Sequence, residues 1–164
     1  MKLFIIILFA WLFVGCSAYK PPVTYNFNNE KVISDNFDNV WQRSIEWFAE
    51  HNTPIKNMDK GTGFISSDYN LDANNSSDCY DCGVPGKVIL AEHRLEEPSG
   101  NFNVIIKKLG DEKTNVKITC FFSIISRVYM DGQIKDTRKL KCNSTGVMEE
   151  SFLNYVTRKS YNGN

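Results

Sequence analysis

Four cysteines beyond the N-terminal region are the residues whose type and spacing could do chemistry. Cys79 and Cys82 form a Cys-x-x-Cys motif in a polar stretch, and Cys120 and Cys142 lie in separate strand-like runs. An even set of cysteines in an oxidising compartment favours disulfide bonds. We expect Cys79 to pair with Cys82, because a two-residue gap can close, and Cys120 to pair with Cys142 across a hairpin.

Two other kinds of cysteine chemistry compete with this interpretation. A redox Cys-x-x-Cys motif needs a lowered thiol pKa, usually at a helix N-terminus, whereas here Asp78 and Asp81 flank the thiols and would raise it. A structural zinc ion needs four converging ligands, and the chain has no second Cys-x-x-Cys motif. We therefore expect structural disulfides with no metal and no cofactor. A small periplasmic thiol-redox or ligand-binding protein that uses the Cys79–Cys82 loop remains the alternative.

The remaining polar residues give no catalytic pattern. The two histidines, His51 and His93, fall at the end of a predicted helix and inside a predicted strand. No nucleophile elbow, phosphate-binding glycine loop or supported carboxylate pair is present. The chain has 19 basic and 19 acidic residues, so it lacks the basic excess typical of nucleic-acid binding. We expect a protein that is not an enzyme and has no nucleic-acid partner.

The stretch from Asn36 to Ser67 predicts one helix followed by a tight strand hairpin. Its apolar residues recur at three- and four-residue spacing and form one broad face: Phe37, Val40, Trp41, Ser44, Ile45 and Phe48. Asn52 and Pro54 end the helix, because Asn tolerates a left-handed conformation and Pro cannot continue a helix. The turn residues from Asp59 to Gly63 then connect two strands.

The run from Thr114 to Met130 is the clearest strand in the chain. Val, Ile, Cys and Phe occupy most of its even positions from 116 to 128, and Lys, Thr, Ser and Arg occupy many of the odd ones, so the even positions face a core. Met130-Asp131-Gly132 is a good hairpin loop. A hairpin symmetric about Asp131 places Cys120 opposite Cys142 and Phe122 opposite Leu140.

The other elements complete an α+β fold. We expect a first strand within Tyr25–Ile33, a long loop over Ser66–Gly86 and a helix over Gly146–Lys159. Lys87–Leu95 and Asn101–Leu109 read as strands joined by a turn. The order β-α-β-β-β-β-β-α predicts an antiparallel sheet with two helices on one face.

The N-terminus has the features of an export signal. One positive charge precedes an apolar run from Leu3 to Val14, which is shorter than the roughly 20 residues of a membrane-spanning helix. The junction at Gly15-Cys16 resembles a bacterial lipobox, in which the cysteine carries lipid. We expect a lipoprotein signal peptide over 1–15, lipidation of Cys16, a tether over 16–29 and one domain over 30–164. Ser17 after the cysteine implies, by the same resemblance, an outer-membrane location on the periplasmic side.

The helix and hairpin also carry a family resemblance. The residues Phe37-Asp38-x-Val40-Trp41-Gln42-Arg43, then Pro54-Ile55-Lys56, then Asp59-Lys60-x-x-Gly63-Phe64-Ile65 resemble the repeated helix-grip domain of BamC. BamC is a lipoprotein of the outer-membrane β-barrel assembly machinery. The resemblance covers about thirty residues, most of which build the fold. It implies a helix-grip-like domain whose surfaces contact other envelope proteins.

Two surfaces are the expected partner sites. Phe121, Ile125 and Tyr129 lie on the odd face of the long strand, away from the predicted core, and an exposed apolar patch of this kind marks a binding site. Tyr80 lies in the cysteine loop, and tyrosine buries a large area while keeping a polar tip. The sequence thus predicts a lipid-anchored binding or scaffold lipoprotein of an envelope assembly, with an envelope protein as partner.

Overall fold

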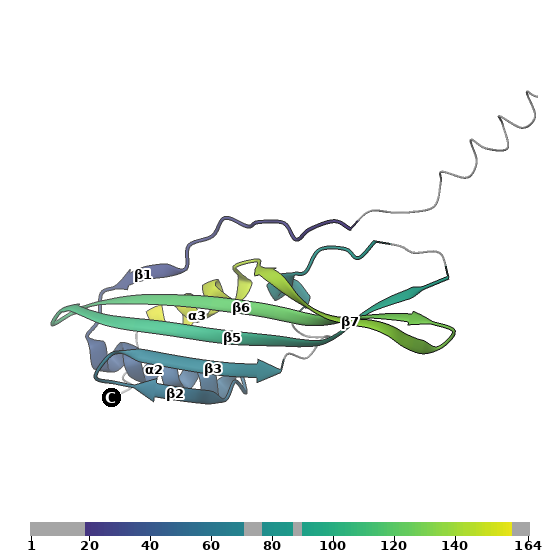
Figure 1. Ribbon diagram of the computed structural model, residues 1–164. Helices are drawn as coiled ribbons and strands as arrows, with labels where there is room; N and C mark the ends of the chain where they lie inside the picture. Colours follow the sequence, from purple (N-terminus) through teal and green to yellow (C-terminus); the bar gives the residue numbers. More distant parts are fainter. Residues whose placement is uncertain (1–18, 71–76, 87–89, 159–164) are drawn as a thin grey trace, which may run out of the picture.

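The computed structural model describes residues 19–70, 77–86 and 90–158. Cys16, the predicted signal peptide and the first residues of the predicted tether lie outside these ranges. The described residues form an antiparallel sheet of seven strands with two helices on one face, so the predicted α+β class is confirmed (Figure 1). The helices are α2 (Phe37–Glu50) and α3 (Val147–Thr157). The strands are β1 (Glu30–Ile33), β2 (Ile55–Asp59), β3 (Phe64–Asn70), β4 (Tyr80–Asp81), β5 (Glu92–Gly110), β6 (Lys113–Met130) and β7 (Gln133–Ser144).

The sheet is built around two long hairpins. The strand order is β2-β3-β5-β6-β7-β4, and β1 pairs with β6 at the end that β7 does not reach. The far ends of β5, β6 and β7 extend beyond the helices as a narrow projection (Figure 1). No helix of the described residues is long and apolar enough to span a membrane.

Helix α2 forms where its apolar spacing predicts. The Asn36 side chain caps its first turn by accepting a hydrogen bond from the Asn39 backbone N–H at 2.9 Å. After the helix, Asn52 takes a left-handed backbone conformation with φ of 51°, as expected for a helix end. The face turned to the sheet packs with α3 and the inward side chains of β5 and β6. The largest fully buried side chains of this core are Trp47, Phe48, Phe102 and Phe152.

Gly63 sets the close approach of the β2–β3 turn to the sheet. Its φ is +70°, and a Cβ built on it would lie 1.9 Å from the backbone oxygen of Ile106. The Gly63 carbonyl accepts a hydrogen bond from the Ile106 N–H at 2.8 Å. The turn predicted from Asp59 to Gly63 therefore depends on glycine for both conformation and space.

Strand β5 differs from the sequence prediction. The sequence predicts two strands, Lys87–Leu95 and Asn101–Leu109, joined by a turn, but one strand runs from Glu92 to Gly110 against β6. Residues 87–89 lie outside the described ranges. The residues between them form a β-bulge in which Glu97 takes a φ of 54°. A bulge leaves a residue outside the ladder, so Pro98 is tolerated there without a backbone donor.

The segment predicted as a tether is partly fixed to the domain. Lys20 and Val84 exchange backbone hydrogen bonds of 3.0 and 2.9 Å, and the Val23 N–H donates to the Asp81 carboxylate at 2.8 Å. The Asn143 side chain donates to the Val23 carbonyl at 2.9 Å. These backbone groups find partners on the domain surface, so the chain from Lys20 onward follows it.

Candidate functional site

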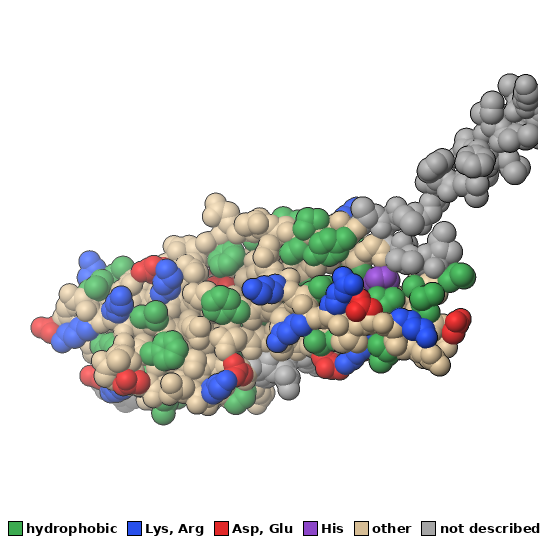
Figure 2. Space-filling model, viewed as in Figure 1, with side chains coloured by type: hydrophobic (Ala, Val, Ile, Leu, Met, Phe, Trp, Pro, Cys, Tyr) green, Lys and Arg blue, Asp and Glu red, His purple; other side chains and the backbone are tan. Residues whose placement is uncertain are grey.

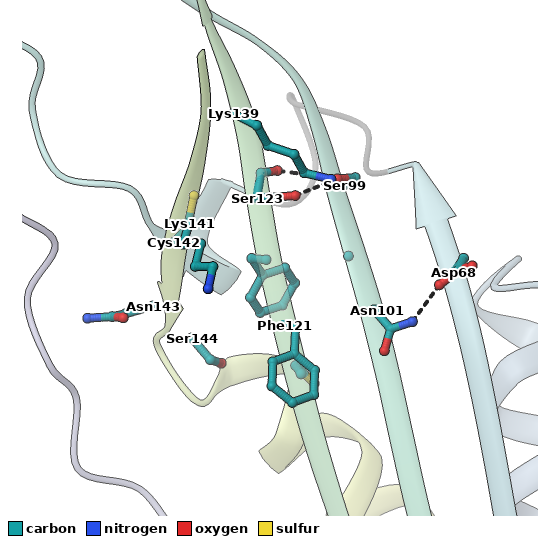
Figure 3. A pocket seen from close by; sticks show the side chains of 13 residues that line it. Asp68, Ser99, Asn101, Phe121, Ser123, Lys139, Lys141, Cys142, Asn143 and Ser144 are labelled. Carbon is teal, nitrogen blue, oxygen red and sulfur yellow. Dashed lines mark hydrogen bonds between the residues drawn. The ribbon is translucent and has the colours of Figure 1, made fainter.

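The sheet face opposite the helices carries a groove of about 700 Å³. Strands β3, β5, β6 and β7 supply its walls, because side chains alternate between the two faces of each strand. Figure 3 shows the lining side chains that project from these strands. They include Asp68, Ser99, Asn101, Phe121, Ser123, Lys139, Lys141 and Asn143.

Phe121 is the aromatic centre of this groove. It occupies an odd position of β6, pairs with Asn101 of β5 and is 55% exposed. Its neighbours Cys120 and Phe122 point to the other face and are buried. The alternation along β6 predicted that Phe121 would lie on the open face, and it does.

Polar side chains line the side of the groove that is formed by β3 and β5. Asp68 accepts hydrogen bonds from the side chains of Lys56 and Asn101. Both bonds lower the pKa of its carboxyl, and the bond from Lys56 has the larger effect. The hydroxyl oxygens of Ser99 and Ser123 lie 2.8 Å apart across β5 and β6. This wall can offer hydroxyl and amide groups to a ligand beside a carboxylate that stays ionised.

The β7 side of the groove is cationic. Lys139 and Lys141 pair with Ile125 and Ser123 of β6 and are exposed on the open face. Neither lysine makes an ion pair within the described residues. Neither lysine belongs to the sites expected from the sequence, although both occupy odd positions in the strand that returns from the Met130-Asp131-Gly132 loop.

Ile125 and Tyr129 lie farther along β6 and outside the groove. Both are half-buried. The Arg94 guanidinium stands 4.6 Å from the centre of the Tyr129 ring, and the Tyr129 hydroxyl donates to Glu96 at 3.4 Å. Arg127 binds Glu96 and Glu97, and those hydrogen bonds raise the pKa of its guanidinium. Basic and acidic side chains therefore gather on this projecting end of the sheet, where an apolar patch was expected around Tyr129 (Figure 2).

Tyr80 is part of the fold at the other edge of the sheet. It is half-buried in β4, pairs with Ser144 of β7, and its ring centre lies 5.5 Å from that of Phe122. This packing joins the cysteine loop to the core. A second, shallower hollow, which Tyr80 lines with Asp81 and Leu95, lies beside it.

The disulfide connectivity differs from the prediction. Cys82 is bonded to Cys142, whereas Cys79 and Cys120 are unbonded and buried. The expected Cys79–Cys82 and Cys120–Cys142 bonds are therefore wrong in this structure. Cys82 reaches Cys142 because β4, which directly precedes Cys82, pairs with the end of β7.

The register of the β6–β7 ladder explains why Cys120 does not lie opposite Cys142. The hairpin turns through two residues, Asp131 and Gly132, both with positive φ, and the ladder has a bulge beside the turn, between Val128 and Tyr129. Together they shift the ladder by two residues from the symmetric prediction. Phe122, rather than Cys120, therefore lies opposite Cys142.

Cys79 and Cys120 belong to an interior cluster with a buried carboxylate. Burial first, and then Asp78 and Glu149, raise the pKa of the Cys79 thiol. Burial and Glu149 raise that of Cys120 as well. Reactive cysteines need a lowered pKa and access to solvent. The positions of these sulfur atoms therefore give the thiol-redox alternative no support.

The histidines and acidic residues give no metal centre in the described part of the chain. No group of three His, Cys, Asp or Glu side chains there could hold a metal ion. The His51 ring stacks on Trp47 at 4.4 Å, and its Nδ1 lies 2.8 Å from the Trp47 carbonyl oxygen. His51 thus serves the end of α2, as the sequence predicts.

No protein-family model, curated protein or solved structure matches this chain. The resemblance to BamC therefore stays an expectation from the helix and hairpin residues.

Proposed function

We propose that this protein is a non-catalytic binding lipoprotein of the cell envelope that holds a partner protein in the groove around Phe121. Lipid on Cys16 would anchor it to the outer membrane on the periplasmic side. The observation that carries the proposal is an exposed aromatic ring at the centre of a groove lined by hydroxyl, amide and ammonium groups. Protein interfaces commonly combine an aromatic anchor with a polar rim.

The groove favours binding over chemistry. Ser99 and Ser123 bond to each other, and the described residues that line the groove include no histidine to act as a base. Asp68 is already bound by Lys56 and Asn101. These groups are arranged to donate and accept hydrogen bonds at a surface.

The binding surface is tested by crosslinking from Phe121 in intact cells. A photocrosslinking residue at Phe121 is expected to capture one defined envelope protein, because the side chain projects from the open face. The matched control places the same residue at Gln42, which is exposed on α2 on the opposite side of the sheet. Capture from Gln42 and not from Phe121 would show that the helices form the interface.

The membrane anchor is tested by replacing Cys16. The Cys16→Ala chain is expected to lose palmitate labelling and to leave the outer-membrane fraction, because the thioether-linked lipid would have no attachment point. Cys79→Ala is the control, since it removes a cysteine but leaves the signal junction unchanged. Retained palmitate or retained membrane association in Cys16→Ala would contradict the lipoprotein assignment.

A further inference from the structure

The outer edge of β7 is open beside the groove. Strand β4 pairs only with Ser144 and Asn143, and the Cys82–Cys142 bond closes the ladder at that point. From Gln133 to Lys141, β7 pairs with β6 on one side and with no described strand on the other. Half of its backbone N–H and C=O groups on that stretch therefore point outward, which is a template for an added strand.

The charges on this edge are uneven. Arg138 and Asp136 form an ion pair of 2.6 Å on the side of the sheet that faces the helices, so they neutralise each other. Lys139 and Lys141 lie on the open face without an ion-pair partner among the described residues. Ile134, which shares the open face with Tyr129, is 53% exposed. The edge thus presents two neighbouring positive charges and one apolar side chain on one face.

We infer that β7 binds an extended acidic segment of the partner protein by strand addition. The inference rests on the proposed function and names the chemistry of its partner. Residues i and i+2 of an added strand point to the same face, so two acidic residues at that spacing would lie next to Lys139 and Lys141. An apolar residue farther along the segment would cover Ile134.

A second copy of this chain fits the edge less well. Antiparallel pairing of two β7 edges would bring the same cationic side chains of two molecules together, and like charges on neighbouring strands repel. An acidic segment turns the same lysines into attractive contacts. Charge therefore favours a partner of opposite sign over self-association.

The test uses the full-length chain and short capped peptides. The probe peptide alternates Glu with Thr and Val, and its counterpart carries Lys in place of Glu. The acidic peptide is expected to bind about tenfold more tightly, the effect of two exposed charge pairs. Amide chemical shifts in NMR spectra are expected to change along 133–141 and not along β2, the opposite edge.

Reversing the charge of the two lysines tests whether the acidic peptide is attracted by this edge or by the charge of the whole protein. Lys139→Glu/Lys141→Glu is expected to reverse the preference, so that the lysine peptide binds better. The control Lys107→Glu/Lys113→Glu makes the same change of charge beside the β5–β6 turn, where both lysines are exposed, and is expected to leave the preference unchanged.

Several outcomes would overturn the inference. An acidic peptide with N-methylated backbone amides that binds as tightly as the unmodified one would show attraction without strand addition. Concentration-dependent dimers with shifts along 133–141 would make a second copy the occupant. Absence of binding at millimolar peptide would also reject it. If Phe121 captures its partner with equal yield in the parent and in the Lys139→Glu/Lys141→Glu chain, the proposed function stands and the addition of an acidic strand at β7 is wrong.

Discussion

Replacing Arg43 is expected to lower the free energy of unfolding by about 3–5 kcal/mol, the range for breaking a buried ion pair. Arg43 is 5% exposed at its side chain and lies 2.8 Å from the Asp35 carboxylate. Its Nε also donates to the Val156 carbonyl at 2.9 Å. That carbonyl belongs to the last turn of α3, where helical carbonyls lack partners within the helix. One guanidinium therefore joins α2, α3 and the residue before the α2 cap.

The variant for this test is Arg43→Met, which keeps most of the apolar stem and removes the charge. Urea denaturation of the variant measures the loss, which has two sources: the Asp35 carboxylate and the Val156 carbonyl lose their partner. The control is Lys60→Ala, because Lys60 and Asp38 form an exposed pair of 2.7 Å. Exposed pairs contribute about 0–1 kcal/mol. Equal losses in the two variants would show that burial does not decide the value of the Arg43 contact.

The same cluster predicts sensitivity to acid. Burial favours the neutral form of Asp35, but hydrogen bonds from Asn39, Arg43 and the Asn36 N–H outweigh it and hold the carboxyl pKa below the usual 3.8. Because the folded-state pKa lies below that of the unfolded chain, the stabilisation is present at neutral pH. It is lost as the pH falls through the folded-state pKa. Arg43→Met is therefore expected to flatten the acid limb of the stability curve.

Loss of the Cys82–Cys142 bond is expected to have an effect of similar size. The bond joins residues 60 positions apart. The chain-entropy estimate for a loop of that length is about 4 kcal/mol. Cys82→Ser/Cys142→Ser should lose this amount in urea denaturation, and a reducing agent should destabilise the parent chain and leave the double variant unchanged.

A matched variant distinguishes the effect of losing the disulfide bond from the effect of removing two sulfur atoms. Cys79→Ala/Cys120→Ala removes the two unbonded thiols, each at a typical cost of about 1 kcal/mol. Peptide mapping of the unreduced protein should find Cys82 linked to Cys142 and should find the other two cysteines alkylated only after denaturation, because both are buried. A peptide linking Cys120 to Cys142 would restore the pairing expected from a symmetric hairpin.

The elements whose signals are local follow directly from the amino-acid sequence. The apolar spacing of 37–48 determines the buried face of α2, and the capping chemistry of Asn36 acts within one turn. Alternation along 114–130 places Phe121 on the open face, because successive side chains of a strand point to opposite sides. These features depend on neighbours a few residues away, so the fold class and the central groove residue could be read from the chain.

The way in which those elements meet depends on contacts between residues far apart in the chain. A two-residue turn and one bulge shift the β6–β7 ladder by two residues, which is enough to exchange Cys120 for Phe122 opposite Cys142. The β4–β7 pairing then selects Cys82 as the partner. Likewise, Lys139 and Lys141 join Phe121 in one groove only because β7 lies beside β6 in this register. The bulge and the choice of neighbouring strands depend on packing over the whole sheet, since strand preferences reflect contacts with cross-strand neighbours more than the local sequence.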